Sequence, residues 1–188
     1  MKLVQVAKSF GAVMAAPVRI RRHPDRPSTD ASHYAIPTLA DSAEAASVRA
    51  ADIPVQSTPK GRWADWPPLV LAGCDEPLAD GAPDLRGMWL TYKGPMKGHI
   101  ERVEQAGSRV VITSAGIIHD LSVGLLMRDE GVGGADISVT PRFENGRINL
   151  YVGGKRLVVT RYADGDDMVW RWGPWTSRLR RMSGPADL

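Results

Sequence analysis

The feature that most constrains this chain is a run of short strand-forming segments separated by turns, from Gly87 to Met182. Most segments are rich in β-branched or aromatic residues and are bounded by Gly, Pro, Asn or Asp. No helical pattern lies between them, which excludes parallel βαβ units. The predicted strands cover residues 87–93, 99–105, 109–115, 117–121, 125–128, 136–140, 148–152, 156–162, 168–172 and 176–182.

The sharpest local signal is the turn Asn145-Gly146 between two such segments. Asn-Gly supplies the two positive φ angles that a type I′ hairpin turn needs, so it predicts an antiparallel hairpin. A closed barrel leaves no unpaired strand edge in a domain of this size. The sequence therefore predicts an all-β fold: a small antiparallel up-and-down barrel of eight to ten strands over residues 85–182, followed by a short tail, 183–188.

Residues 1–84 are predicted to be mostly irregular. A basic arm, residues 1–22, contains no acidic residue and fits an organellar presequence or a frayed tail. Residues 23–66 are rich in Pro, Ala, Ser and Asp, with few large apolar side chains, and are interpreted as a linker. Residues 69–71, together with Trp63 and Trp66, are expected to pack against the outside or one end of the barrel. On this interpretation residues 1–60 are dispensable for folding.

The composition bears on what the protein binds and on where in the cell it is located. Cys74 is the only cysteine, so an internal disulfide is excluded, and no apolar run approaches the ~20 residues of a membrane span. Residues 85–188 hold fifteen Lys and Arg against eleven Asp and Glu, so the predicted domain is only weakly basic, which argues against nucleic-acid binding. We expect a cytoplasmic protein. The alternatives are an organelle, through the arm, and a lipid anchor at Cys74, since residues 71–74 have the pattern of a lipoprotein cleavage site.

Candidate acid–base residues are the two histidines of the predicted domain, His99 and His119, together with Tyr92. His119 and Asp120 are neighbours on one strand and so point to opposite faces, which means that adjacency alone makes no catalytic pair. No cluster of His, Cys or Glu at metal-ligand spacing is present, so neither a metal nor a cofactor is expected.

The candidate ligand wall is the strand at 168–172, where three large side chains alternate on one face. On the preceding strand, Arg161 alternates with Leu157 and Val159; if that face is inward, the guanidinium needs an anionic partner. That partner is a ligand carboxylate or one of Glu101, Glu104 and Asp136. The candidate ligand-binding residues are Met168, Trp170, Trp172, Tyr151 and Arg161.

Two features together resemble the calycin superfamily, the lipocalins and their relatives. They are Gly87-Met88-Trp89 on the first strand and an arginine on the last strand, with Arg178, Arg180 and Arg181 as candidates. The resemblance covers residues 85–182 and implies that Trp89 closes the narrow end of the barrel while the arginine stacks across it. Such stacking gains about 1 kcal/mol.

The resemblance implies lipocalin-like binding of a small apolar or amphipathic molecule in the barrel. A barrel enzyme acting on an apolar metabolite, such as an isomerase, cyclase or hydrolase, is one alternative. It would use His99 or His119 as the base and Tyr92, Tyr151 or Arg161 to hold an oxyanion. The other alternative is a partner-binding module that uses the arm and the region of Trp63 and Trp66.

Overall fold

The computed structural model describes residues 26–34, 48–72, 74–131 and 135–188. The basic arm, residues 1–22, lies outside the described residues, and so does any test of the presequence hypothesis. Within these ranges, three short 3₁₀ turns accompany the strands, at Ala31–His33, Ala50–Asp52 and Pro185–Asp187. In the described part of the chain, no helix is long and apolar enough to span a membrane.

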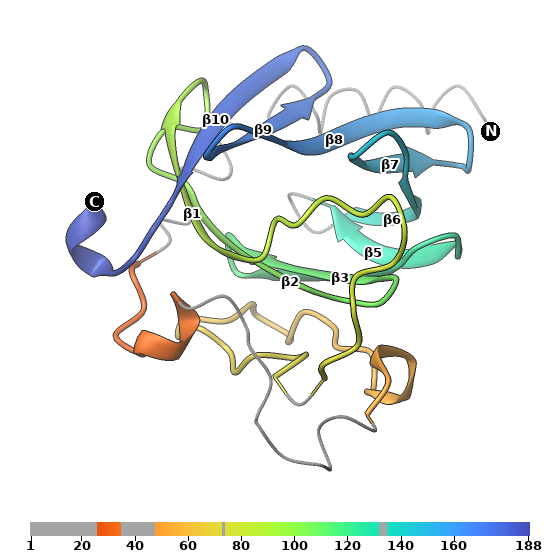
Figure 1. Ribbon diagram of the computed structural model, residues 1–188, viewed down its shortest axis with the longest axis horizontal. Helices are drawn as coiled ribbons and strands as arrows, with labels where there is room; N and C mark the ends of the chain where they lie inside the picture. The colour runs from red at the N-terminus through yellow and green to blue at the C-terminus, as the bar shows by residue number, and fades with distance from the viewer. Residues whose placement is uncertain (1–25, 35–47, 73, 132–134) are drawn as a thin grey trace.

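In the described chain, ten strands form one antiparallel sheet in which consecutive strands pair, except β4 and β5, and β1 also pairs with β10. The sheet curls into a nearly closed barrel (Figure 1), which confirms the predicted all-β fold. The two ends of the sheet, β4 and β5, lie side by side without a backbone hydrogen-bond ladder. The strands are β1 (Gly87–Lys93), β2 (Ile100–Ala106), β3 (Arg109–Ser114), β4 (Ile117–Ser122), β5 (Met127–Gly131), β6 (Ala135–Phe143), β7 (Ile148–Val152), β8 (Arg156–Asp164), β9 (Asp167–Trp172) and β10 (Trp175–Arg181).

The hairpin between β6 and β7 forms where the Asn-Gly signal places it. Asn145 and Gly146 have φ angles of 54° and 67°, the positive pair of a type I′ turn. The flanking Glu144 and Arg147 exchange backbone hydrogen bonds of 3.0 and 3.1 Å. The turn thereby fixes the register in which Ile148 and Leu150 are buried.

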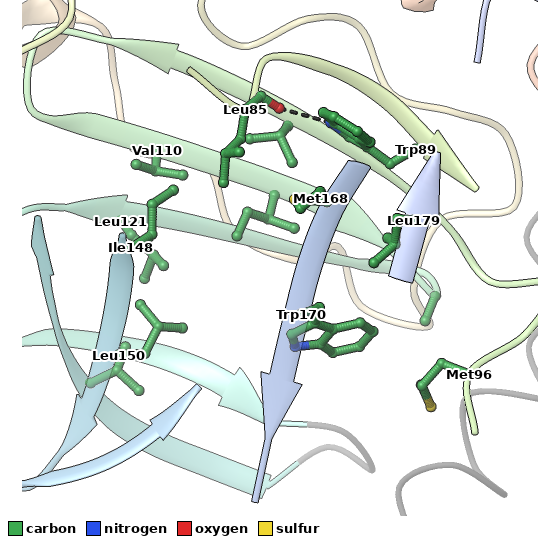
Figure 2. Packing of buried hydrophobic residues seen from close by; sticks show 14 residues of the cluster. Leu85, Trp89, Met96, Val110, Leu121, Ile148, Leu150, Met168, Trp170 and Leu179 are labelled. Atoms are coloured by element: carbon green, nitrogen blue, oxygen red, sulfur yellow. Dashed lines mark hydrogen bonds between the residues drawn. The ribbon is translucent and has the colours of Figure 1, made fainter. Parts of the chain in front are cut away.

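The barrel interior is a single apolar cluster (Figure 2). Its members come from strands on all sides of the barrel because inward-facing residues alternate along each strand. Trp89 is one of two buried tryptophans in it, and its Nε1 donates a 2.8 Å hydrogen bond to the carbonyl of Leu85, which satisfies the only polar atom of the side chain. The fully buried members include Leu85, Val103, Val110, Leu121, Ile148, Met168 and Leu179.

A segment before the barrel covers its outside. Residues 48–74, apart from residue 73, lie along the outer face of β2, β3 and β4 (Figure 1), where Trp63, Leu71 and Cys74 pack on apolar residues of the strands. Hence β2 and β3 are buried on both faces. The linker interpretation of residues 23–66 is therefore wrong for residues 48–66. We call residues 48–74, without residue 73, the cover.

Buried charges attach the cover to the strands. The Arg109 guanidinium donates to the carbonyls of Ala50, Ile53 and Pro54 at 2.5–3.0 Å and is paired with Asp120 at 2.6 Å. The cover thus packs on the barrel although it has few large apolar residues, because its backbone carbonyls accept the hydrogen bonds of the buried Arg109 guanidinium. Cys74, at the end of the cover, is itself buried, so a lipid on that thiol would require this packing to open.

Candidate functional site

A cavity of about 100 Å³, partly open to solvent, lies inside the barrel between β3 and β9. Its wall is mostly aliphatic and aromatic, since inward positions of these strands carry Ile, Val, Leu and Trp. Four polar side chains also reach it: Ser114, His119, Asp129 and Arg161. An apolar wall with a few polar groups is the usual composition of a small-molecule site.

The aromatic part of the wall comes from β9. Trp170 and Trp172 alternate on this strand, as the sequence pattern predicts, and their rings stack at 5.9 Å with an interplanar angle of 3°. Both line the cavity. Met168, the third residue of the pattern, is fully buried in the core beside the cavity and does not line it.

Trp170 also carries an unsatisfied polar atom. Its side chain is buried, and no described residue accepts a hydrogen bond from its Nε1–H. A buried donor left unpaired costs roughly 1–3 kcal/mol. A wall residue with such a donor is therefore suited to a ligand that carries an acceptor.

Arg161 points inward and is paired within the protein. Its Nε and Nη2 donate to the two carboxylate oxygens of Glu101 at 3.1 Å each, and its guanidinium lies 4.7 Å from the centre of the Trp170 ring. Of the partners that the sequence offers for Arg161, the structure thus selects Glu101. Leu157 does not share the inward face with Val159 and is 48% exposed, because the β7–β8 pairing shifts register at Leu150.

His99 lies beside the buried pair of Arg161 and Glu101. Burial favours the protonated form of Glu101, but the charge of Arg161 and the bonds from Arg161 and His99 outweigh it and lower the pKa of Glu101 to about 2. His99 Nε2 lies 3.7 Å from Oε2 of Glu101, and its ring packs against Trp170 at 5.5 Å. His99 thus lies behind the cavity wall and does not line it.

The cavity has a second polar group at the seam between β4 and β5. His119 Nδ1 lies 2.7 Å from Oδ2 of Asp129, and Oδ1 of Asp129 accepts the backbone N–H of Glu130 at 2.8 Å. As alternation along β4 predicts, Asp120 faces the other way, toward Arg109. The partner of His119 therefore comes from the facing strand and not from its sequence neighbour.

The cover reaches the same seam. Arg62 donates through Nη1 to the carbonyl of Ala115 at 2.9 Å and through Nη2 to Glu130 at 3.2 Å. Ala115 lines the cavity. Side chains of β4, β5 and the cover therefore bridge the seam where the backbone ladder is missing.

Both tyrosine candidates lie away from the cavity. Tyr92 is 37% exposed and donates to Asp167 at 2.5 Å, a bond that raises the pKa of Tyr92. Tyr151 donates to Glu144 at 2.6 Å and packs under Arg142. Neither side chain is near His119 along the cavity wall. The structure thus brings together His119, Arg161, Trp170 and Trp172, and leaves out His99, Tyr92, Tyr151 and Met168.

The arginine that stacks on Trp89 is Arg181, with its guanidinium carbon 4.4 Å from the ring centre. Of the three candidates, Arg178 and Arg180 do not take this position. Arg178 instead pairs with Asp164 and Asp167, and Arg180 donates to the carbonyl of Asp187. The register of β1 with β10 sets Trp89 opposite Arg181, which decides among the three.

Asp129 is a site residue whose partner the sequence pattern does not identify. It lies in the charged run Arg128-Asp129-Glu130, which fits either the barrel mouth or a solvated turn. The signal that finds it is strand pairing: the run is part of β5, and its alternation turns Asp129 toward His119. Across the described ranges, no group of three or more His, Cys, Asp or Glu could hold a metal ion.

Comparison with known proteins yields structural likeness without sequence relatives. No protein-family model matches the chain, and no curated protein matches it. A solved structure of human cRBP IV has 14% identity and a TM-score of 0.45, covering 53% of this chain and 98% of that one. A mutant of the REP1-NXSQ fatty acid transporter has 12% identity and a TM-score of 0.42, with the same coverage.

A third match is the fatty-acid-binding protein from Manduca sexta, with 18% identity and a TM-score of 0.35, covering 45% of this chain and 72% of that one. The barrel fold itself rests on the ten-strand order of this chain.

Proposed function

We propose that the barrel binds a small, largely apolar molecule in the cavity between β3 and β9. The observation that carries the proposal is the cavity itself, an apolar space of about 100 Å³ within a core of large buried side chains. Protein interiors are close-packed, and a cavity near this size lined by aliphatic side chains accepts benzene.

The cavity size sets the ligand size. Pockets for drug-sized ligands measure about 300–1,000 Å³, well above the space present here. The proposed ligand is therefore a single ring or a short chain. A longer molecule enters only if Trp172, which is partly exposed, moves aside.

A variant pair tests the proposal. Ile137 lines the cavity, so Ile137→Phe fills it, whereas Ser138 is exposed on the outer face of the same strand, so Ser138→Phe is the matched control. Benzene is titrated into each protein and followed by two-dimensional NMR. Saturable shifts at Trp170 and Trp172 in the wild type and in Ser138→Phe, and their loss in Ile137→Phe, are expected. Equal shifts in all three proteins would show that benzene binds elsewhere.

One observation favours a second function, acid–base catalysis. A carboxylate that binds Nδ1 of a histidine orients the ring and leaves Nε2 to take a proton, as catalytic bases require. The His119–Asp129 pair has this arrangement on the cavity wall. The test is to follow the consumption of metabolites from a cell extract by mass spectrometry. Turnover by the wild type and its loss in Asp129→Asn, with the melting temperature kept, would establish it.

A further inference from the structure

The hydrogen-bonding capacity of the cavity is asymmetric. A carboxylate only accepts hydrogen bonds, so His119 donates to Asp129 through Nδ1–H, and in the neutral ring Nε2 is an acceptor. No described residue hydrogen-bonds to Nε2. On the opposite part of the wall, the buried Nε1–H of Trp170 is a donor without an acceptor in the described chain. The wall therefore offers one free acceptor and one free donor.

A hydroxyl group matches both kinds of partner, since it donates one hydrogen bond and accepts others. An ether accepts but cannot donate to Nε2. A hydrocarbon does neither and leaves the donor of Trp170 unpaired. Ser114 lines the same wall and is a diagonal neighbour of His119 across β3 and β4. Its own hydroxyl is a further hydrogen-bonding group for the hydroxyl of the ligand.

The charges of the cavity disfavour an anion. Arg161 is the one cationic Lys or Arg side chain among the described lining residues, and Glu101 already takes two of its hydrogen bonds. The Asp129 carboxylate lines the wall as well. An entering carboxylate would lose its hydration, meet an arginine that is already neutralised and face a like charge.

We propose that the cavity selects a neutral, short alcohol or phenol over an ether or a carboxylate of the same size, with His119 Nε2 accepting the hydroxyl proton and Trp170 Nε1–H donating to its oxygen. The inference rests on the proposed function, because it names the chemical class that the same cavity takes.

Three probes test the selectivity: pentan-1-ol, its isomer 1-methoxybutane, and pentanoate, each titrated at pH 8 and followed by NMR at Trp170 and Trp172. The alcohol and the ether contain the same atoms, so they differ chiefly in the donor. We expect pentan-1-ol to bind about tenfold more tightly than the ether, the ratio that one hydrogen bond gives, and more tightly than pentanoate. His119→Phe is expected to remove this preference, while the outer-face control Ser138→Phe keeps it.

The outcomes separate the two proposals. Equal affinity for alcohol and ether, or tighter binding of pentanoate, overturns the selectivity and leaves cavity binding intact. Absence of binding by all three probes and by benzene overturns both. If His119→Phe does not fold, the wild-type ratio of alcohol to ether still decides the selectivity.

Discussion

The Nδ1 atom of His119 lies 2.7 Å from Oδ2 of Asp129, and this hydrogen bond joins β4 to β5, the two sheet ends that no backbone ladder connects. Every other neighbouring pair around the barrel shares backbone hydrogen bonds. Opening the wall elsewhere breaks several such bonds at once, whereas opening this seam breaks side-chain contacts. Because His119 and Asp129 also line the cavity, we expect ligands to enter here.

Arg161→Met is expected to destabilise the protein by about 3–5 kcal/mol, because it leaves the Glu101 carboxylate buried without its guanidinium partner. The double variant Arg161→Met/Glu101→Leu is expected to recover much of that loss, since no charge is then orphaned. Urea unfolding measures both. Arg178→Met, at an exposed pair, is the control and should cost about 0–1 kcal/mol. A double variant no more stable than the single one would contradict this account.

The same pair predicts a pH dependence. The pKa of Glu101 falls from 4.5 to about 2 on folding, so its stabilising contribution is complete above pH 4.5 and is lost as the pH falls toward 2. Burial raises the pKa of Glu104 despite the nearby Arg102, which acts in the opposite direction. Because Glu104 also contributes to the pH dependence of stability, the contribution of Glu101 is obtained as the difference in unfolding free energy between the wild type and Glu101→Gln. It should shrink as the pH falls through that window; a constant difference would show that Glu101 is not charged when folded.

Gly87→Ala is expected to destabilise the barrel more than Gly146→Ala does. Both glycines have positive φ, 122° and 67°, but a Cβ on Gly87 would lie 2.6 Å from Nη1 of Arg181, whereas nothing lies within 4 Å at Gly146. The Arg181 side chain must then shift off Trp89 and lose a contact worth about 1 kcal/mol. Thermal melts of the two variants measure the difference. Equal melting temperatures would mean that the backbone angle alone requires glycine.

Deleting residues 1–60 is expected to lower the melting temperature, contrary to the expectation from composition. The deletion removes the carbonyls of Ala50, Ile53 and Pro54 that Arg109 binds, and it exposes the outer face of β3. Arg109→Met in the full chain should also destabilise, because Asp120 then lacks its partner. A truncated protein that melts like the full chain would show that residues 48–60 of the cover add no stability.

Local chemistry made the strands predictable. The Asn145-Gly146 turn and the alternation on either side need no information from the rest of the chain. The cover was predictable only at Trp63, Trp66 and residues 69–71, whose apolar side chains favour packing on the barrel. Its polar contacts were not predictable, because they join residues far apart in the sequence. Arg109 looks like an exposed strand residue until Ala50, 59 positions earlier, is placed against it. The scarcity of large apolar residues in this segment suggested a linker, whereas hydrogen bonds between its backbone carbonyls and buried charged side chains hold it on the barrel.

Some residues of the candidate site were likewise predictable from one strand alone, and others were not. Trp170 and Trp172 follow from alternation within one strand, and an inward Arg161 follows from its apolar neighbour Val159. Asp129 does not, because a charged run reveals its buried partner only once β4 and β5 are brought together. Choosing Arg181 among three arginines likewise requires the register of β1 with β10.

The most direct measurement of the central claim is a crystal structure of the protein under xenon pressure, since xenon occupies empty apolar cavities. The account predicts a xenon atom inside the barrel, in contact with Val139, Leu150 and Trp170, at the cavity between β3 and β9. A barrel whose side chains have closed over that space, or one in which ordered waters fill it and no xenon binds, would contradict the proposed apolar site.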